Sequence, residues 1–286
     1  MDGFLLVDKP KGITSFSLCN KIKYQLNLDK VGHCGTLDPN ATGLMLICCN
    51  KATKLVKLFD YDEKCYIATI AIGLDSDTLD MDTSNITHYK MDNVNINDII
   101  SGLEYLKAKK TQIPPLTSAI KVNGKKLYEY QRENKEVELK ERNVELLDYK
   151  ILSDLILEDD IYYIDIYLHV SKGFYIRSLA RDLGEYLNGK AILKDLRRTN
   201  IGKLSIDNSK KIEELSISDI IPISKFVNLD ILEVNDYIAK LVKNGVLLDE
   251  RQIQTDKCFY VSNKNVIIAI YEPILKYKYK PILILK

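Results

Sequence analysis

A glycine-rich loop between two apolar segments constrains the fold of this 286-residue chain more than any other feature. Residues 31–43 read VGHCGTLDPNATG, and an apolar run of strand length follows them at 44–49. Pro39 disfavours helical backbone angles at Asp38 and holds this residue extended, while the glycines let the backbone approach a ligand closely. A lone Asp-Pro is usually a structural turn. Here His, Thr and Asn accompany the carboxylate, which favours a functional site.

Apolar periodicity outside this loop predicts both strands and helices. Runs rich in β-branched and aromatic residues at 64–72 and 161–170 have the length and composition of buried strands. An apolar stripe with helical spacing begins after Gly173 and predicts a helix whose first turn contains Arg177. The chain is therefore expected to fold as an α+β protein.

The pattern also predicts where the chain divides. Near residue 227 its character changes to one short helix at 236–243 followed by short strands. We therefore expect a larger domain over residues 1–227 and a small, mostly-β unit over residues 228–286. Within the larger domain, residues 113–137 read as an insertion.

This insertion interleaves cations with aromatic side chains. Cations for phosphates beside aromatic rings for bases suit a protrusion that binds RNA. From composition alone, a solvated charged helix over 125–134 is about equally plausible. The residues concerned are Lys121, Lys125, Lys126, Tyr128, Tyr130 and Arg132.

Arg177 is placed where a helix macrodipole disfavours a cation. Such a cation favours an anionic partner, either a carboxylate or a phosphate, although an exposed arginine of little consequence is the plain alternative. A buried pair with Asp38 would lower the pKa of that carboxyl group and keep it ionised. An ionised carboxylate is what a nucleophilic aspartate requires.

Charge and cysteine content exclude several protein classes. Lys and Arg total 41 against 40 Asp and Glu, so a histone-like binder is excluded. A nucleic-acid enzyme is not excluded, because a phosphate backbone responds to a local patch of charge rather than to net charge.

Six cysteines without C-x-x-C spacing predict free thiols in a reducing compartment. With no signal-peptide pattern and no membrane-length apolar run, we expect a cytoplasmic protein that contacts no membrane.

Two candidate metal sites fail on their ligands. His33 and Cys34 are adjacent, and adjacent side chains do not normally converge on one ion. The acidic segment 75–82 lacks the glycine and glutamate that a calcium-binding EF-hand loop needs.

Tyr66 lies in a predicted strand, where a tyrosine by itself is most often a packing residue.

Six segments, in order along the chain, carry a resemblance to a known family: GFLLVDKPKGITS, VGHCGTLDPNATG, KCYIATIAIGLDSDTLD, IPPLTSAIKVNGKKLYEY, SKGFYIRSLARDLGEYL and LRRTNIGKL. Together they resemble the TruB family of tRNA pseudouridine synthases. They cover roughly residues 3–205, whereas the Asp38 loop alone would be only suggestive. The C-terminal unit resembles a PUA-like RNA-binding domain by position and size.

The resemblance implies a fold and an activity. The fold would be a mixed, mostly antiparallel central sheet flanked by helices, with the active cleft across its middle and the insertion near 113–137 gripping RNA. The enzyme would be an isomerase that needs no cofactor or metal and no obligate protein partner. It would convert the uridine at position 55, in the T arm of tRNA, to pseudouridine by flipping the base and using an aspartate to break and re-form the glycosidic bond.

The resemblance also assigns residues. It implies that Asp38 is the catalytic aspartate, Arg177 its partner, and Tyr66 the ring that stacks on the target base. His33 would occupy the space left by the flipped nucleotide. Further substrate-binding positions would be Tyr175, Leu196, Lys9 and Lys172, with Lys11 nearby. From charge and position, Lys172, Arg197 and Arg198 are predicted to hold backbone phosphates.

Two departures from the family pattern and two competing functions remain. Cys34 replaces the usual threonine after the histidine, and Thr117 stands where an aromatic residue usually precedes Ser-Ala, which leaves the shape of the pocket rim open. A non-catalytic RNA-binding protein would have no use for a buried carboxylate near phosphates. A metal-dependent hydrolase using His33 and Asp38 would lose its activity in excess chelator.

Overall fold

The computed structural model describes residues 1–59, 63–118, 121–122, 124–127, 130, 137 and 139–285. Ten of the described strands join one large sheet, ordered β11-β13-β4-β14-β3-β1-β16, with β12, β15 and β2 paired beside it. Its strands are β1 (Gly3–Lys9), β2 (Val31–Cys34), β3 (Thr42–Cys49), β4 (Glu63–Ile72), β11 (Leu146–Ile151), β12 (Ile156–Glu158), β13 (Ile161–Ser171), β14 (Ala191–Ile201), β15 (Leu204–Ser205) and β16 (Ile221–Pro222).

The large sheet is mixed and mostly antiparallel, as predicted. The only parallel pairing among its described strands joins β14 to β3, where Arg197 and Arg198 lie opposite Thr42 and Gly43. Gly43 has a φ of +107°, and a Cβ there would lie 2.3 Å from the Arg198 carbonyl oxygen. Glycine is therefore required at the point where the Asp38 loop rejoins the sheet beside β14.

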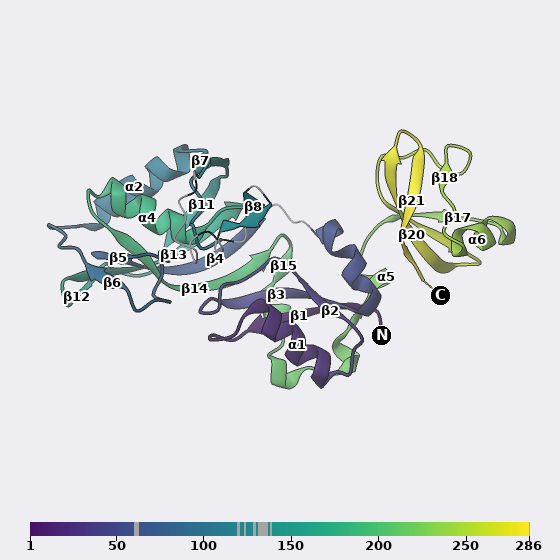
Figure 1. Cartoon of the computed structure of the whole chain (residues 1–286), viewed down its shortest axis with the longest axis horizontal. Helices are drawn as coiled ribbons and strands as arrows, with labels where there is room; N and C mark the ends of the chain where they lie inside the picture. Colours follow the sequence, from purple (N-terminus) through teal and green to yellow (C-terminus); the bar gives the residue numbers. More distant parts are fainter. Residues whose placement is uncertain are drawn as a thin grey trace.

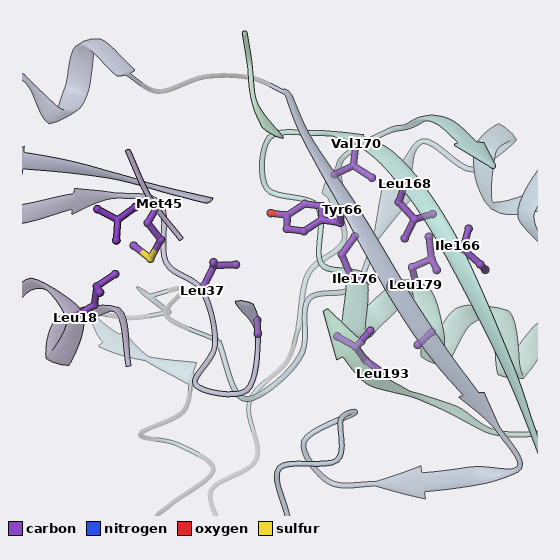
Figure 2. Close-up of a cluster of buried hydrophobic side chains, with 14 of the residues drawn as sticks. Leu18, Leu37, Met45, Tyr66, Ile166, Leu168, Val170, Ile176, Leu179 and Leu193 are labelled. Atoms are coloured by element: carbon purple, nitrogen blue, oxygen red, sulfur yellow. The ribbon is translucent and has the colours of Figure 1, made fainter. Parts of the chain in front are cut away.

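Helices cover the sheet and bury its apolar face. α1 (Ser15–Gln25) is capped by Thr14, whose side chain accepts a hydrogen bond from the Ser17 amide. α2 (Ile96–Ala108) and α4 (Ile176–Tyr186) pack against each other, and α4 also packs against β14. Figure 1 shows α2 and α4 on the same side of the sheet. Their apolar stripes meet the inward residues of β4 and β13 in the main core, part of which Figure 2 shows.

Short elements complete the larger unit, among them one that differs from the sequence prediction. The 3-10 helix η1 spans Asn50–Phe59. Residues 31–34 form strand β2 rather than loop, because they pair with β3. The others are β5 (Leu74–Ser76), β6 (Ile86–His88), β7 (Thr111–Gln112), β8 (Lys121–Val122), β9 (Lys125–Lys126), β10 (Arg142–Asn143), η2 (Ile206–Asn208), η3 (Ile212–Glu214), η4 (Ile217–Asp219) and α5 (Ile223–Phe226).

The expected insertion at 113–137 is described only in part. The predicted helix over 125–134 begins instead with strand β9, which pairs with β8. Tyr128 and Arg132, which we predicted to contact RNA, lie outside the described residues.

The C-terminal residues form a second sheet, ordered β17-β19-β20-β21-β18. It stands apart from the first sheet at the right of Figure 1, and it begins three residues after the boundary expected at residue 227. The separate C-terminal β domain expected from the sequence is therefore present. Its elements are β17 (Asp230–Glu233), α6 (Asp236–Lys243), β18 (Leu248–Asp249), β19 (Phe259–Asn263), β20 (Val266–Leu275) and β21 (Lys278–Ile284).

The two units share an apolar interface. Tyr260, Ile270 and Leu283 of the second sheet belong to the same buried cluster as Phe4 and Phe59 of the larger unit. The Tyr260 hydroxyl lies 2.9 Å from the carbonyl oxygen of residue 227, to which it donates a hydrogen bond. Because apolar surface from both units is removed from water here, the contact stabilises their arrangement.

None of the helices in the described ranges has the length and apolar character needed to cross a membrane.

Candidate active site

A cavity of about 330 Å³ opens between the Asp38 loop, β4, the start of α4 and β14. The loop supplies Asp38, β4 supplies Tyr66, and β14 supplies Leu196. Figure 2 shows the Tyr66 side chain projecting from β4 with its hydroxyl directed toward the side on which Leu37 lies. The remaining wall consists of Gly35, Thr36, Leu37, Lys64, Thr117, Ser118, Val170, Ser171, Gly173, Phe174, Tyr175, Ile176, Arg177 and Arg198.

The predicted pair between Asp38 and Arg177 is present. Arg177 Nε lies 3.1 Å from Asp38 Oδ2. The Arg177 side chain is only 7% exposed, whereas that of Asp38 is 43% exposed. The carboxylate is thus held from behind by a buried cation while it remains open to the cavity. This arrangement suits a carboxylate that reacts with a molecule entering from solvent.

Arg177 is itself held by groups from two other segments. Its Nη1 donates hydrogen bonds to the Thr78 carbonyl oxygen at 2.9 Å and to Thr117 Oγ1 at 2.5 Å. Its Nη2 donates to the Thr117 carbonyl oxygen at 3.1 Å. A second carboxylate, Asp80, lies 3.5 Å from Nη1. One guanidinium therefore serves two carboxylates and three neutral acceptors.

Sequence reasoning missed Asp80 and Thr117 as parts of the site. Asp80 lies in the acidic segment that we considered only as a calcium loop, and Thr117 was noted only as a departure from the family pattern. The available signal for Asp80 was its place in the segment KCYIATIAIGLDSDTLD, one of the six that carry the family resemblance. Within the described part of the chain, no three His, Cys, Asp or Glu side chains gather as a metal site would require.

The pKa of Asp38 shifts in the direction opposite to the predicted one. Burial of the carboxyl group raises its pKa above the ordinary value, and Arg177 opposes this rise without cancelling it. Asp80 and Asp82 raise the pKa further, whereas Lys9 lowers it. The predicted net lowering is therefore wrong, because desolvation and the neighbouring carboxylates outweigh the arginine.

Lys9 has a structural position rather than one in the cavity wall. It is fully buried, and its Nζ donates to the carbonyl oxygens of Pro10, Ile13 and Pro39 at 2.7–3.0 Å. Burial lowers its pKa to about 8. All three ammonium protons are directed at backbone oxygens, and the contact between Lys9 and substrate stays a prediction. Its bond to Pro39 fixes the peptide that follows Asp38.

The other predicted substrate residues differ in whether they line the cavity. Tyr66, which is 7% exposed, and Leu196 line the cavity. Tyr175 also lines it, just before α4, and burial raises the pKa of its hydroxyl. His33 lies on β2 outside this wall. Its buried Nδ1 has no hydrogen-bond partner among the described residues, and burial lowers the pKa of its ring. Lys172 is exposed in the turn before α4 and is not among the lining residues.

The two adjacent arginines of β14 have different environments. Arg198 is 1% exposed, and its guanidinium donates to the carbonyl oxygens of Leu44, Thr36 and Gly35 at 2.8–3.4 Å. Its predicted role as a phosphate ligand is wrong, since the group is buried and supports the Asp38 loop. Arg197 pairs with both carboxylate oxygens of Asp8, at 3.1 and 2.7 Å.

Comparison with known proteins agrees with this architecture. A family model described as "TruB family pseudouridylate synthase (N terminal domain)" matches residues 23–176. The chain is 44% identical to "tRNA pseudouridine synthase B" of Aster yellows witches'-broom phytoplasma (strain AYWB), over 98% of this chain and 99% of that protein. It is 41% identical to the protein with the same name from Acholeplasma laidlawii (strain PG-8A), over 96% of both chains.

Among solved structures, one described as "Crystal Structure of a Cbf5-Nop10-Gar1 Complex" contains a chain with the same fold. The TM-score is 0.67 at 22% identity, and the alignment covers 99% of this chain and 84% of that chain. At this identity the similarity concerns the fold.

Proposed function

Because this chain belongs to the TruB family and is a pseudouridine synthase acting on tRNA, we propose that its target is the uridine at position 55 in the T loop, with Asp38 as the catalytic carboxylate. The observation that carries the proposal is the position of Asp38. It is held at 3.1 Å by a buried arginine and faces a cavity walled by Tyr66 and Leu196. A cavity of about 330 Å³ is of the size that receives small ligands.

The uridine must leave its stack before it reaches this cavity. Base flipping costs a few kcal/mol in unstacking, and stacking on the ring of Tyr66 returns about 1–3 kcal/mol. Leu196 closes the cavity from the side of β14. His33, on the neighbouring strand β2, is proposed to fill the space that the flipped nucleotide leaves in the RNA.

The reaction exchanges one glycosidic bond for another without net oxidation. The bond from C1′ to N1 breaks, the uracil turns within the cavity, and a bond from C1′ to C5 forms. C5 then loses its proton, and N1 ends the reaction protonated. Asp38 provides the carboxylate for cleavage, and Arg177 holds it. Tyr66, which lines the same cavity, is proposed to receive the C5 proton.

The raised pKa of Asp38 predicts how the rate depends on pH. The reaction needs the ionised carboxylate, so the rate falls as pH decreases through the pKa of Asp38. Because burial raises that pKa, the acid limb lies at a higher pH than an ordinary aspartate would give.

Asp38→Asn tests the assignment. The amide fills the same space but cannot act as a carboxylate, so we expect the rate to fall by at least about 10³-fold, while the Kd for tRNA stays within about threefold. Release of tritium from tRNA labelled at uridine C5 measures turnover. Asp75→Asn is the matched control, because its carboxylate pairs with Lys190 on the surface. Near-normal release by Asp38→Asn would remove Asp38 from the mechanism.

The target position and the competing functions are tested in the same tRNA. Mapping of pseudouridine after incubation with the wild-type protein is expected to show modification at position 55 of the T arm. Modification at another position would contradict the proposed target, and tight binding without any modification would favour a non-catalytic RNA-binding protein. Loss of turnover in excess chelator would favour the metal-dependent alternative.

A further inference from the structure

The Arg177 guanidinium lies between two carboxylates, so a further contact is needed to orient it toward one of them. Its Nε meets Asp38 at 3.1 Å, while its Nη1 lies 3.5 Å from Asp80. Both carboxylates attract the same cation, but only Asp38 lines the cavity. The orientation of the guanidinium therefore decides how strongly its positive charge acts on the Asp38 carboxylate.

Thr117 contacts both terminal nitrogens of this guanidinium. Its hydroxyl oxygen accepts from Nη1 at 2.5 Å, and its carbonyl oxygen accepts from Nη2 at 3.1 Å. Because a guanidinium is planar and rigid, fixing its two terminal nitrogens also fixes the direction in which Nε points. We propose that Thr117 is a positioning residue, which aims the Arg177 guanidinium at Asp38.

Of the two Thr117 acceptors, only the hydroxyl belongs to the side chain and can be removed by a substitution. Without it, Nη1 keeps the Thr78 carbonyl but loses its shortest neutral acceptor. After the Thr78 carbonyl, Asp80 is then the acceptor that remains for Nη1, at 3.5 Å, and it carries a negative charge. The guanidinium would turn toward Asp80, and its hold on Asp38 would lengthen.

The residues that precede Thr117 are anchored to the start of α4. The side chain of Gln112 both donates to and accepts from the Tyr175 backbone, at 3.0 and 2.9 Å. The Ile113 carbonyl oxygen accepts from Ser178 Oγ at 2.9 Å and from Arg181 Nη2 at 3.0 Å. The segment that leads into the insertion is thus bonded to α4 along its first two turns, so Thr117 joins the base of the insertion to the catalytic pair.

A matched pair of variants tests this inference, which rests on the proposed role of Asp38. Thr117→Val keeps the shape but removes the acceptor, and Thr117→Ser keeps the hydroxyl. For Thr117→Val we expect single-turnover rates about tenfold lower at neutral pH, an acid limb moved up by roughly half a pH unit, and a tRNA Kd within about twofold of wild type. For Thr117→Ser we expect the wild-type rate and acid limb.

Two results would overturn the inference. Wild-type rates and acid limb in Thr117→Val would show that the acceptor is unimportant. Equal losses in both variants would assign the effect to the missing methyl packing or to general disturbance. The unchanged tRNA Kd serves as the check that each variant is folded.

A measurement on the free protein separates this inference from the proposed function. The Asp38 carboxyl carbon can be titrated by NMR and assigned with Asp38→Asn. A titration midpoint that rises in Thr117→Val but not in Thr117→Ser supports the positioning role even if the wild-type protein makes no pseudouridine. Three identical midpoints would contradict it, whatever the activity.

Discussion

Lys9 carries a charged group into the interior of the larger unit, where three backbone carbonyls surround it. Removing an ammonium from water is costly, so the folded protein releases its proton more readily than the unfolded chain does. The pKa falls from 10.5 to about 8 for this reason. One of the three carbonyls belongs to Pro39, and so the lysine supports the loop at Asp38.

This lowered pKa predicts a dependence of stability on pH. Between about pH 8 and 10.5 the unfolded chain holds the Lys9 proton and the folded protein does not, so the contribution of Lys9 to stability increases as pH rises. The free energy of unfolding of the wild type, relative to Lys9→Met, should increase by about 3 kcal/mol across that window. Urea denaturation at several pH values measures it. Lys11→Met, which removes an exposed lysine of the same motif, serves as the control, and parallel pH profiles for wild type and Lys9→Met would contradict the prediction.

At the scale of elements, α4 carries Arg177 and must lie close to β14. The contact depends on Gly184, whose position allows backbone to approach backbone. A Cβ at Gly184 would lie 2.3 Å from the Ala191 amide nitrogen and 2.6 Å from the Lys190 carbonyl carbon. These backbone atoms belong to the start of β14 and cannot move without shifting the strand.

Gly184→Ala should therefore reverse the usual effect of alanine in a helix. Glycine to alanine ordinarily stabilises a helix interior by about 1 kcal/mol, but here we expect a loss of at least about 2 kcal/mol from overpacking. Gly102→Ala in α2 is the comparison, since its Cβ would meet side-chain atoms of Leu183 and Tyr186, which can rotate away. Thermal and urea denaturation rank the two variants. A Gly184→Ala protein as stable as Gly102→Ala would contradict the prediction.

At the scale of the whole molecule, the C-terminal sheet is joined to the larger unit through a shared apolar cluster. Removing residues 228–286 would expose Phe4 and Phe59, so a deletion would disturb the larger unit as well as any RNA contact. Surface substitutions on the second sheet are the cleaner test of its role. The exposed Lys276 and Lys278, at the turn from β20 into β21, are suited to it.

We expect the double change Lys276→Gln and Lys278→Gln to weaken tRNA binding, because the C-terminal unit is proposed to bind RNA. The Kd should rise by about threefold to tenfold, and the slope of log Kd against log salt should fall by about one per lysine. Turnover at saturating tRNA should not change. Lys240→Gln with Lys264→Gln, on the α6 side of the same unit, is the matched control. An unchanged Kd would deny this turn a role in RNA binding.

The sequence predicted several of the elements well because their formation depends on local chemistry. Apolar periodicity predicted the helix at 236–243 with its observed bounds, and it placed Arg177 in the first turn of a helix. Glycines and Pro39 marked the Asp38 loop through their own backbone preferences. The strand at 31–34 escaped prediction because only pairing with β3 makes it a strand.

The chain by itself therefore determined on which elements the candidate residues Tyr66 and Arg177 lie. Tertiary structure decided what surrounds them. Adjacent Arg197 and Arg198 look alike in sequence, but one meets Asp8 and the other is buried against the Asp38 loop, because neighbouring side chains leave a strand on opposite faces. The pKa of Asp38 likewise rises or falls with burial and with charges from distant segments. Desolvation and long-range contacts are properties of the folded chain, so local sequence does not contain them.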